Sequence, residues 1–198
     1  MTDPLPEGAR LLGEVVLLQV HRAAIAVEDG YDVSHLLDAE ALSIGPHGVS
    51  GLVAGAWVLD VHHDAHPERR GDGRRALSIG FTGHYRLMAQ RFGEVPLGVG
   101  AENLVVDAPG RIDPGDLAGG VLVAGTDGPI PLHGARVAEP CRQFTSHLLG
   151  RGDVARREEI TADLEFLSGG MRGFILDTDR VAHPMRVHRG DLVWIAPA

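Results

Sequence analysis

One cysteine offers the most specific chemistry in this sequence, because it directly follows a proline. Cys141 is the only cysteine of the chain, and Pro140 precedes it. Proline suits the first position of a helix, which predicts the thiol near the second position. Backbone N–H groups and the positive end of the helix dipole there favour a thiolate, which can ligate a soft metal or carry a persulfide sulfur. Cys141 also shares helical spacing with Phe144 and Leu148, so an ordinary core side chain stays open as the alternative.

Three histidines stand close together in a polar stretch of the chain. If residues 52–62 form a strand, then His62, His63 and His66 lie at its end and on the following loop. Imidazoles placed in this way could converge on a divalent metal ion, with Asp60 or Asp64 as the next candidate ligand. No HExxH pattern accompanies them, and an exposed histidine-rich loop is the alternative interpretation.

Two glycine-containing stretches could shape a binding site. The turn at residues 98–104 ends in Glu102 and Asn103, which offer an acceptor and a donor, while its glycines permit close backbone approach to a ligand. Farther along, Arg172 could hold an anionic ligand as a two-pronged fork, and Gly173 leaves room beside it. An ordinary turn and an exposed turn arginine are the competing interpretations.

The basic residues exclude several functions. All 18 are arginine and none is lysine, which rules out a Schiff-base lysine for pyridoxal phosphate, a phosphate-loop lysine and a lysine base. The net charge of −9 argues against broad nucleic-acid binding. The only basic cluster, Arg69, Arg70, Arg74 and Arg75, is best interpreted as a solvated loop. Nothing resembles a nucleophile elbow.

The remaining composition predicts a soluble cytoplasmic protein of one domain over residues 1–198. A single cysteine cannot form an intrachain disulfide. No apolar run approaches the roughly 18 residues of a membrane span, and no cleavable signal is visible, so we expect no membrane contact. Glycine and proline make up about a fifth of the chain, which favours short strands and many turns over long helices.

Hydrophobic periodicity predicts strands with a few inserted helices. One helix is expected to begin at Thr82 as N-cap, to present Phe81, Tyr85, Met88 and Phe92 on one face, and to end at Gly93. The short apolar runs over residues 94–140 are typical of a small, strongly bent barrel. The other expected strands cover residues 11–21, 23–27, 52–62, 76–79, 173–177 and 192–195, and further helices cover 141–149 and 158–167.

In order along the chain, these segments resemble the MOSC domain, named for the C-terminal part of molybdenum-cofactor sulfurases. Its hallmarks are a G-E-N-L turn, a G-D before a strand, a later P-C, an R-G opening a strand, a terminal G-D-x-V and an upstream G-V-x-G. The matching residues are Ala101-Glu102-Asn103-Leu104, Gly115-Asp116, Pro140-Cys141, Arg172-Gly173, Gly190-Asp191-Leu192-Val193 and Gly48-Val49-Ser50-Gly51. The resemblance covers residues 10–196, and it departs from the family at Ala101, where a glycine is usual, and at Leu52, where an aspartate is frequent.

The resemblance implies a mainly β fold, a MOSC-type barrel with a few peripheral helices, and a molybdenum cofactor. Cys141 would be the molybdenum ligand or sulfur carrier, presented by Pro140, and Arg172 would contact the anionic pterin with Gly173 beside it. Glu102 and Asn103 would shape the pocket. The implied activity is the reduction of small N-oxygenated substrates.

Two alternatives remain beside that activity. One is a non-catalytic module that carries a persulfide or delivers the cofactor. The other is a divalent-metal hydrolase built on His62, His63 and His66. Because no heme, flavin or iron–sulfur motif is present, a reductase would need a separate electron-donor protein, and a sulfur carrier would need a sulfur donor.

Overall fold

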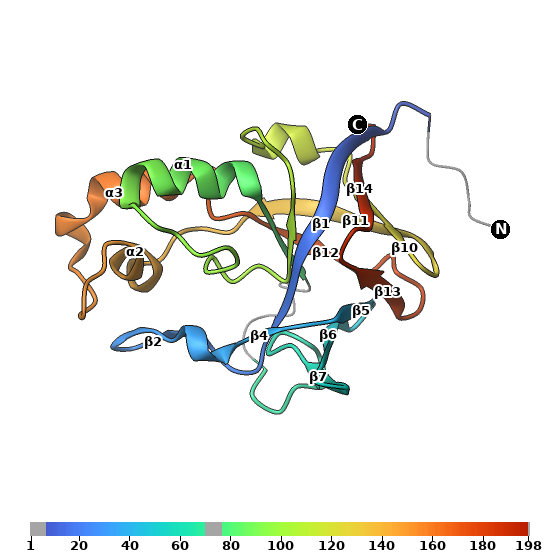
Figure 1. Ribbon diagram of the computed structural model, residues 1–198, viewed down its shortest axis with the longest axis horizontal. Coiled ribbons are helices and arrows are strands. Elements are labelled where there is room, and N and C mark those ends of the chain that lie inside the picture. The colour runs from blue at the N-terminus through green and yellow to red at the C-terminus, as the bar shows by residue number, and fades with distance from the viewer. Residues whose placement is uncertain (1–6, 70–76, 198) are drawn as a thin grey trace.

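The computed structural model describes residues 7–69 and 77–197. Its centre is a closed barrel, because the first and last strands of a seven-stranded sheet also pair with each other in the order β14-β10-β11-β12-β8-β9-β1 (Figure 1). All pairs are antiparallel except β8 with β9. The barrel strands are β1 (Arg10–His21), β8 (Leu77–Phe81), β9 (Leu104–Val106), β10 (Val121–Gly125), β11 (Gly128–Val137), β12 (Phe174–Asp177) and β14 (Leu192–Ile195). The predicted mainly β barrel is confirmed.

A smaller sheet of four strands lies beside the barrel in the order β13-β5-β6-β7. These strands are β5 (Ala41–Gly45), β6 (Gly48–Val53), β7 (Ala56–Leu59) and β13 (Met185–His188), while β4 (Leu36–Asp38) pairs with the end of β1, and β2 (Ala26–Val27) pairs with β3 (Gly30–Tyr31). A side chain at Gly51 in β6 would collide with Val20 of β1, which shows how closely the sheet approaches the barrel.

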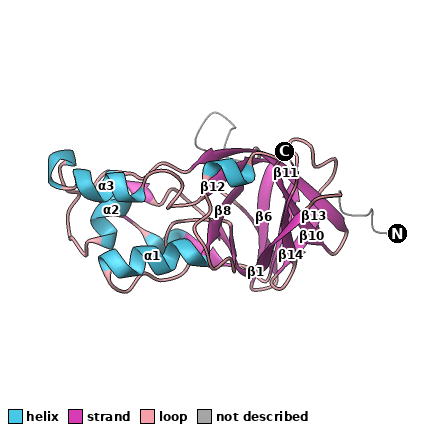
Figure 2. Cartoon of the chain, turned by 90° about the horizontal axis from the view of Figure 1, so that it is seen from above, coloured by secondary structure: helices cyan, strands magenta, loops and turns pink. Residues whose placement is uncertain are grey.

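Three α-helices gather at one end of the barrel (Figure 2). They are α1 (Thr82–Phe92), α2 (Arg142–Leu148) and α3 (Thr161–Leu167), and short 3-10 turns cover Val33–His35, Pro114–Leu117 and Arg157–Glu159. The predicted face of α1 is confirmed for Tyr85 and Met88, which are buried in one cluster with Phe92 packed against it, whereas Phe81 precedes the helix and is buried in the barrel core. Gly93 ends the helix with a positive φ of 85°, a conformation that glycine adopts readily.

The barrel interior forms the main core, and the helices cover a second one. Apolar side chains that alternate along the strands fill the barrel, among them Leu18, Ile79, Val123 and Phe174. The second core, beneath the helices, contains Tyr85, Met88, Phe144, Leu167 and Met171. Strand β12 and the turn before it therefore lie where the two cores meet.

Several boundaries differ from the expected ones. Residues 52–62 are not one strand, because Ala54 and Gly55 both have positive φ (48° and 79°) and turn the chain from β6 into β7. Thr82 is not the N-cap of α1: Phe81 occupies that position, and the Thr82 hydroxyl donates to Asp107. Helix 158–167 begins only at residue 161, after a 3-10 turn.

The predicted strands also differ from the observed ones at other places in the chain. The run at 23–27 forms a strand only at Ala26–Val27, while β5 and β13 belong to no strand that periodicity indicated. The strand expected at 76–79 appears as β8, and Ala76 lies outside the described residues.

Candidate functional site

A cavity of about 190 Å³ opens where β1, β8 and β12 meet the chain that follows β7. Four predicted site residues line it: His62, Glu102, Asn103 and Arg172. His21 and Ser78, which sequence reasoning did not single out, complete its polar lining. The structure therefore brings together residues from distant parts of the chain.

Glu102 is a carboxyl group buried at this cavity, with 2% of the residue exposed. Its Oε2 accepts a hydrogen bond of 2.7 Å from the Tyr85 hydroxyl, which in turn accepts one from the backbone N–H of Gly100. Burial raises the pKa of Glu102 to about 7, against the opposing effects of the Tyr85 hydrogen bond, a backbone hydrogen bond and Arg172. The carboxyl group is therefore poised to exchange a proton near neutral pH.

Glycines make the space that this carboxyl group occupies. A Cβ at Gly80 or at Gly100 would lie 2.5 Å or 2.6 Å from Glu102 Oε1. Gly173 has a φ of 106°, and a Cβ there would lie 2.4 Å from the carbonyl oxygen of Ile79. Gly173 therefore permits close packing of β12 against β8. It is not among the residues that line the cavity.

The residue before Glu102 carries backbone strain. Ala101 has a φ of 65°, in the left-handed region that favours glycine. Ala101 adopts the conformation at a cost of about 1 kcal/mol.

Asn103 holds three parts of the site together. Its side-chain oxygen accepts hydrogen bonds from the backbone N–H and the hydroxyl of Ser78, at 2.9 Å and 3.0 Å. Its side-chain nitrogen donates to Asp60 Oδ2 at 2.8 Å and to the backbone oxygen of Gln19 at 3.3 Å. Asn103 lines the cavity, and its hydrogen bonds fix the positions of Ser78, Asp60 and Gln19 around it.

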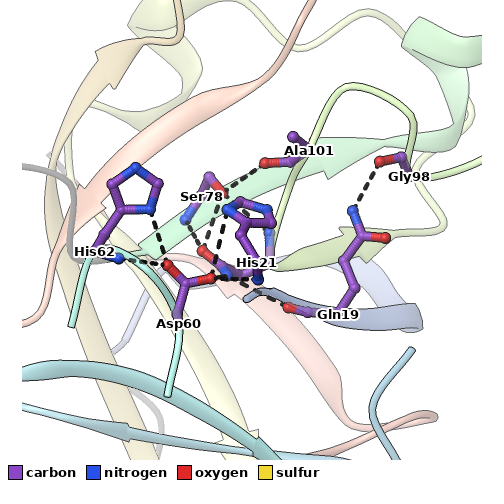
Figure 3. Close-up of polar contacts among 8 residues, drawn as sticks. Gln19, His21, Asp60, His62, Ser78, Gly98 and Ala101 are labelled. Atoms are coloured by element: carbon purple, nitrogen blue, oxygen red, sulfur yellow. Dashed lines mark hydrogen bonds and ion pairs between the residues drawn. The ribbon is translucent and has the colours of Figure 1, made fainter. Parts of the chain in front are cut away.

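Asp60 lies between two histidines, His21 and His62 (Figure 3). The Nδ1 atom of His62 is 2.8 Å from Asp60 Oδ1, and that of His21 is 3.5 Å from Oδ2. His21 ends β1, whereas Asp60 and His62 follow β7. The backbone N–H of Val61 donates to the carbonyl of His21 at 2.7 Å, which joins the two segments directly.

The charges of this group are set by burial and by mutual contact. Burial alone would raise the pKa of Asp60, but the charge of His21, the hydrogen bond and charge of His62 and the His21 backbone N–H lower it far below its usual range. Burial lowers the pKa of His21, although Asp60 opposes this effect. At neutral pH the group is therefore an anionic carboxylate with a neutral imidazole at His21.

Arg172 connects the cavity to Cys141. Its Nε donates to the backbone oxygen of Gly100, and its Nη1 donates to that of Glu139, each at 3.2 Å. The same Nη1 lies 3.9 Å from Cys141 Sγ, and the guanidinium carbon lies 4.9 Å from the Phe144 ring centre, within cation–π range. Its positive charge therefore stands between the sulfur and the polar lining of the cavity.

Cys141 begins α2 in a different way from the one that the sequence predicts. It is the N-cap, with its sulfur accepting from the backbone N–H of Phe144 at 3.4 Å, so neither Pro140 nor Cys141 occupies the first two helical positions. Cys141 is partly exposed, packs beside Phe144, and is not among the residues that line the cavity. Pro140 faces a separate groove on the α3 side.

The other predicted ligands do not join the cavity. His63 and His66 accept hydrogen bonds through Nδ1 from the backbone of the loop that carries them. Among the described residues, the group with metal-ligand spacing contains His62 with His21 and Asp60, and neither His63 nor His66. Of the basic cluster, Arg69 pairs with Asp64 at 2.9 Å, and Arg70, Arg74 and Arg75 lie outside the described residues.

Sequence reasoning missed His21 and Tyr85 as site residues. Tyr85 was expected only as part of the apolar face of α1, yet its hydroxyl bridges Gly100 and Glu102. His21 is the last residue of β1, and polar residues also occur earlier in that strand, so the strand pattern does not single it out. Its proximity to Asp60 depends on pairing across 39 positions, which local patterns do not reveal.

No helix in the described part of the chain has the length and apolar character needed to cross a membrane. No family model matches the sequence, and no curated protein does.

Comparison with solved structures shows likeness in fold at low sequence identity. The YuaD protein from Bacillus subtilis aligns over 94% of both chains with a TM-score of 0.53 and 19% identity. A hypothetical protein aligns over 94% of this chain and 70% of its own, with a TM-score of 0.54 and 16% identity. YiiM from Geobacillus stearothermophilus covers 94% of this chain and 75% of its own, at a TM-score of 0.46 and 14% identity. The first two likenesses show a shared fold, and this fold is compatible with the MOSC-type barrel that the sequence motifs imply.

Proposed function

We propose that the protein binds a molybdenum cofactor with Cys141 as the metal ligand and reduces small N-oxygenated substrates. The observation that carries this proposal is the position of Arg172. Its guanidinium group lies 3.9 Å from Cys141 Sγ and also lines the cavity that contains Glu102 and Asn103. A sulfur ligand, a fixed positive charge and a polar cavity are thus adjacent.

The donor set suits the cofactor chemically. A cysteine sulfur is a soft ligand appropriate to a transition metal. The positive charge of Arg172 is permanent and suits phosphate oxygens, while its Nε and Nη1 already donate to backbone oxygens that hold the group in place. Cys141 is partly exposed, so its sulfur is accessible from outside the core. When bound, the molybdenum centre would supply the two-electron redox chemistry that this chain lacks.

The chain's own residues would bind the substrate and supply protons. Cleavage of an N–O bond to an amine and water consumes two electrons and two protons, with the electrons delivered by a separate donor protein. Glu102 has a pKa of about 7, so its carboxyl group is protonated in a large share of molecules at neutral pH. The Tyr85 hydroxyl holds Oε2, which leaves Oε1 as the oxygen from which a proton can be passed.

The direct test is the molybdenum and pterin content of protein made in a host that synthesises the cofactor. We expect near-stoichiometric molybdenum in the wild type, and a lower molybdenum content in Cys141→Ser and in Arg172→Gln. Arg180→Gln serves as the matched control, because Arg180 is exposed and does not line the cavity. Wild-type protein without molybdenum, or a Cys141→Ser variant with full content, would refute the proposal.

A sulfur-carrier role is the second candidate, and one observation favours it: Cys141 lies outside the cavity lining. A persulfide formed there would face the backbone N–H of Phe144 and the charge of Arg172. Intact-protein mass spectrometry after incubation with a sulfur-donor protein would detect one added sulfur atom, absent in Cys141→Ser. If no adduct forms under these conditions, the carrier role is wrong.

A further inference from the structure

We infer that His21, Asp60 and His62 form a binding site for a divalent transition-metal ion of the zinc type, separate from Cys141. This group is the set of three potential ligands whose donor atoms lie within 4.8 Å of one another in the described parts of the chain. Two imidazole nitrogens and one carboxylate oxygen are common ligands of Zn²⁺ and of similar ions.

The donor spacing fits an ion of this size. Two donors that share a tetrahedral ion at about 2.1 Å each lie about 3.4 Å apart. The Nδ1 atom of His62 lies 2.8 Å from Asp60 Oδ1, which is shorter than that value. The Nδ1 atom of His21 lies 3.5 Å from Asp60 Oδ2, which is close to it. All three donor atoms lie within 4.8 Å of one another, so they are near enough to share one ion.

The carboxylate is already held in place by contacts that a bound ion would leave intact. The backbone N–H groups of His21 and His62 each donate to Asp60 at 2.9 Å, and Asn103 donates at 2.8 Å. Hydrogen bonds of this kind orient metal ligands and strengthen binding. Only the contacts between Asp60 and the two imidazoles would give way to bonds through the ion.

An unsatisfied buried nitrogen supplies independent support. The Nε2 atom of His21, in a residue only 3% exposed, makes no hydrogen bond of ordinary geometry among the described residues, although the backbone of Ala101 lies near the ring. Buried polar atoms are ordinarily paired, so this one calls for an explanation. His21 also lines the cavity, so a polar atom without such a partner belongs to a residue of the proposed site.

The site would remain open on one side. Three protein ligands leave at least one coordination position of such an ion vacant, as in catalytic rather than structural zinc sites. Both histidines line the cavity that contains Glu102 and Arg172. The ion would therefore bind an oxygen of a small molecule held there, with Arg172 available for any negative charge that the molecule carries.

The test measures binding of Co²⁺ and Zn²⁺ alone to the full chain after treatment with a chelator and its removal. We expect one Co²⁺ ion per chain, with the visible absorption of a site containing nitrogen ligands, and its displacement by Zn²⁺. His62→Ala should weaken binding by at least about tenfold, since even loss of a supporting contact costs 10–100-fold. His62 is partly exposed, so this variant is expected to fold. Asp60→Asn tests the carboxylate once circular dichroism shows that it has folded.

Two controls make the outcome decisive. His66→Ala removes a histidine of the neighbouring loop and should leave cobalt affinity unchanged. If His66→Ala instead loses cobalt binding while His62→Ala retains it, the ion binds in the loop and the inference is wrong. Cys141→Ser should also keep full cobalt binding, so the result does not depend on the molybdenum proposal. The inference is equally wrong if the wild type binds no Co²⁺, or if the folded His62→Ala and Asp60→Asn variants both bind it as tightly.

Discussion

Glu102 is expected to give this protein an unusual pH dependence of stability. Its pKa is about 7 in the folded protein, above the ordinary value of 4.5. Stability from this group is complete below pH 4.5 and is lost as the pH rises through 7, by at most roughly 3 kcal/mol. The unfolding free energy of Glu102→Gln, relative to that of the wild type, should therefore be higher at pH 8 than at pH 4.5.

Chemical denaturation of both proteins at several pH values measures this difference. His21 and His84 have lowered pKa values and contribute in the opposite direction, gaining stability as the pH rises toward 6.5. Their contributions are common to both proteins, so the difference in unfolding free energy isolates Glu102. A difference that does not change between pH 4.5 and 8 would show that Glu102 titrates normally.

The strained backbone at Ala101 predicts a stabilising substitution. Ala101→Gly removes the penalty of a left-handed conformation and adds freedom to the unfolded chain, for a net gain of up to about 1 kcal/mol. Ala89→Gly is the matched control, because Ala89 is exposed within α1 and its replacement should cost about 1 kcal/mol. Urea denaturation of the two variants should give changes of opposite sign, and a loss of stability in Ala101→Gly would contradict the assigned strain.

How far the sequence could predict the site depends on the residue. Glu102, Asn103 and Arg172 stand in motifs with their own local signature, and all three line one cavity. His21 has no such signature, since its site role arises from contact with a loop that follows β7. The position of Cys141 outside the lining also depends on how α2 packs, which helical spacing does not specify.

Among the elements, β1 depends on a close approach at Gly13. The register of β1 shifts between Leu11 and Gly13, next to where the strand begins to pair with β9 instead of β14. A Cβ at Gly13 would lie 2.1 Å from the carbonyl oxygen of Asp107. Gly13→Ala should therefore force the backbones apart and destabilise the protein by about 1–3 kcal/mol.

Thermal or urea unfolding measures this loss. Gly30→Ala is the matched control, because nothing lies within 4 Å of a Cβ placed there. If both variants unfold alike, the contact between β1 and the chain at Asp107 is looser than described here.

The start of α2 predicts that the key cysteine variant stays folded. Cys141 caps the helix through its sulfur, and serine is a preferred residue at this position. The apolar contact that Cys141→Ser loses is small, because the side chain is only partly buried. We expect an unfolding free energy within about 1 kcal/mol of the wild type, measured by urea denaturation. A larger loss would mean that Cys141 acts mainly as a core side chain.

Element boundaries were predictable where periodicity was strong and failed where a turn lacked its usual residues. The face of α1 agrees with the expected pattern, with Tyr85 and Met88 buried. The turn between β6 and β7 was missed because its first left-handed position holds Ala54, where asparagine, aspartate or glycine is usual, and Gly55 alone follows it. The run of residues 52–62 therefore looked continuous.

For the molecule as a whole, closure of the barrel joins the two ends of the described chain. Arg10 in β1 pairs with Ile195 in β14, a contact that no local pattern announces. The expectation of a barrel came from many short apolar runs and from the ordered MOSC-like motifs. At the helical end, Cys141 and Phe144 lie beside Arg172. The Cys141 sulfur therefore lies close to the cavity, although the sulfur belongs to the start of a helix and the cavity to the barrel.

The most direct measurement for this account is the molybdenum K-edge X-ray absorption spectrum of protein made in a cofactor-competent host. Two samples suffice: the wild type, and Cys141→Ser reconstituted with the cofactor and corrected for its molybdenum content. We expect one more sulfur ligand per molybdenum in the wild type than in the variant, because Cys141 Sγ contributes it. Identical sulfur coordination in the two proteins, or wild-type protein that never acquires molybdenum, would contradict the assignment of Cys141 as the metal ligand.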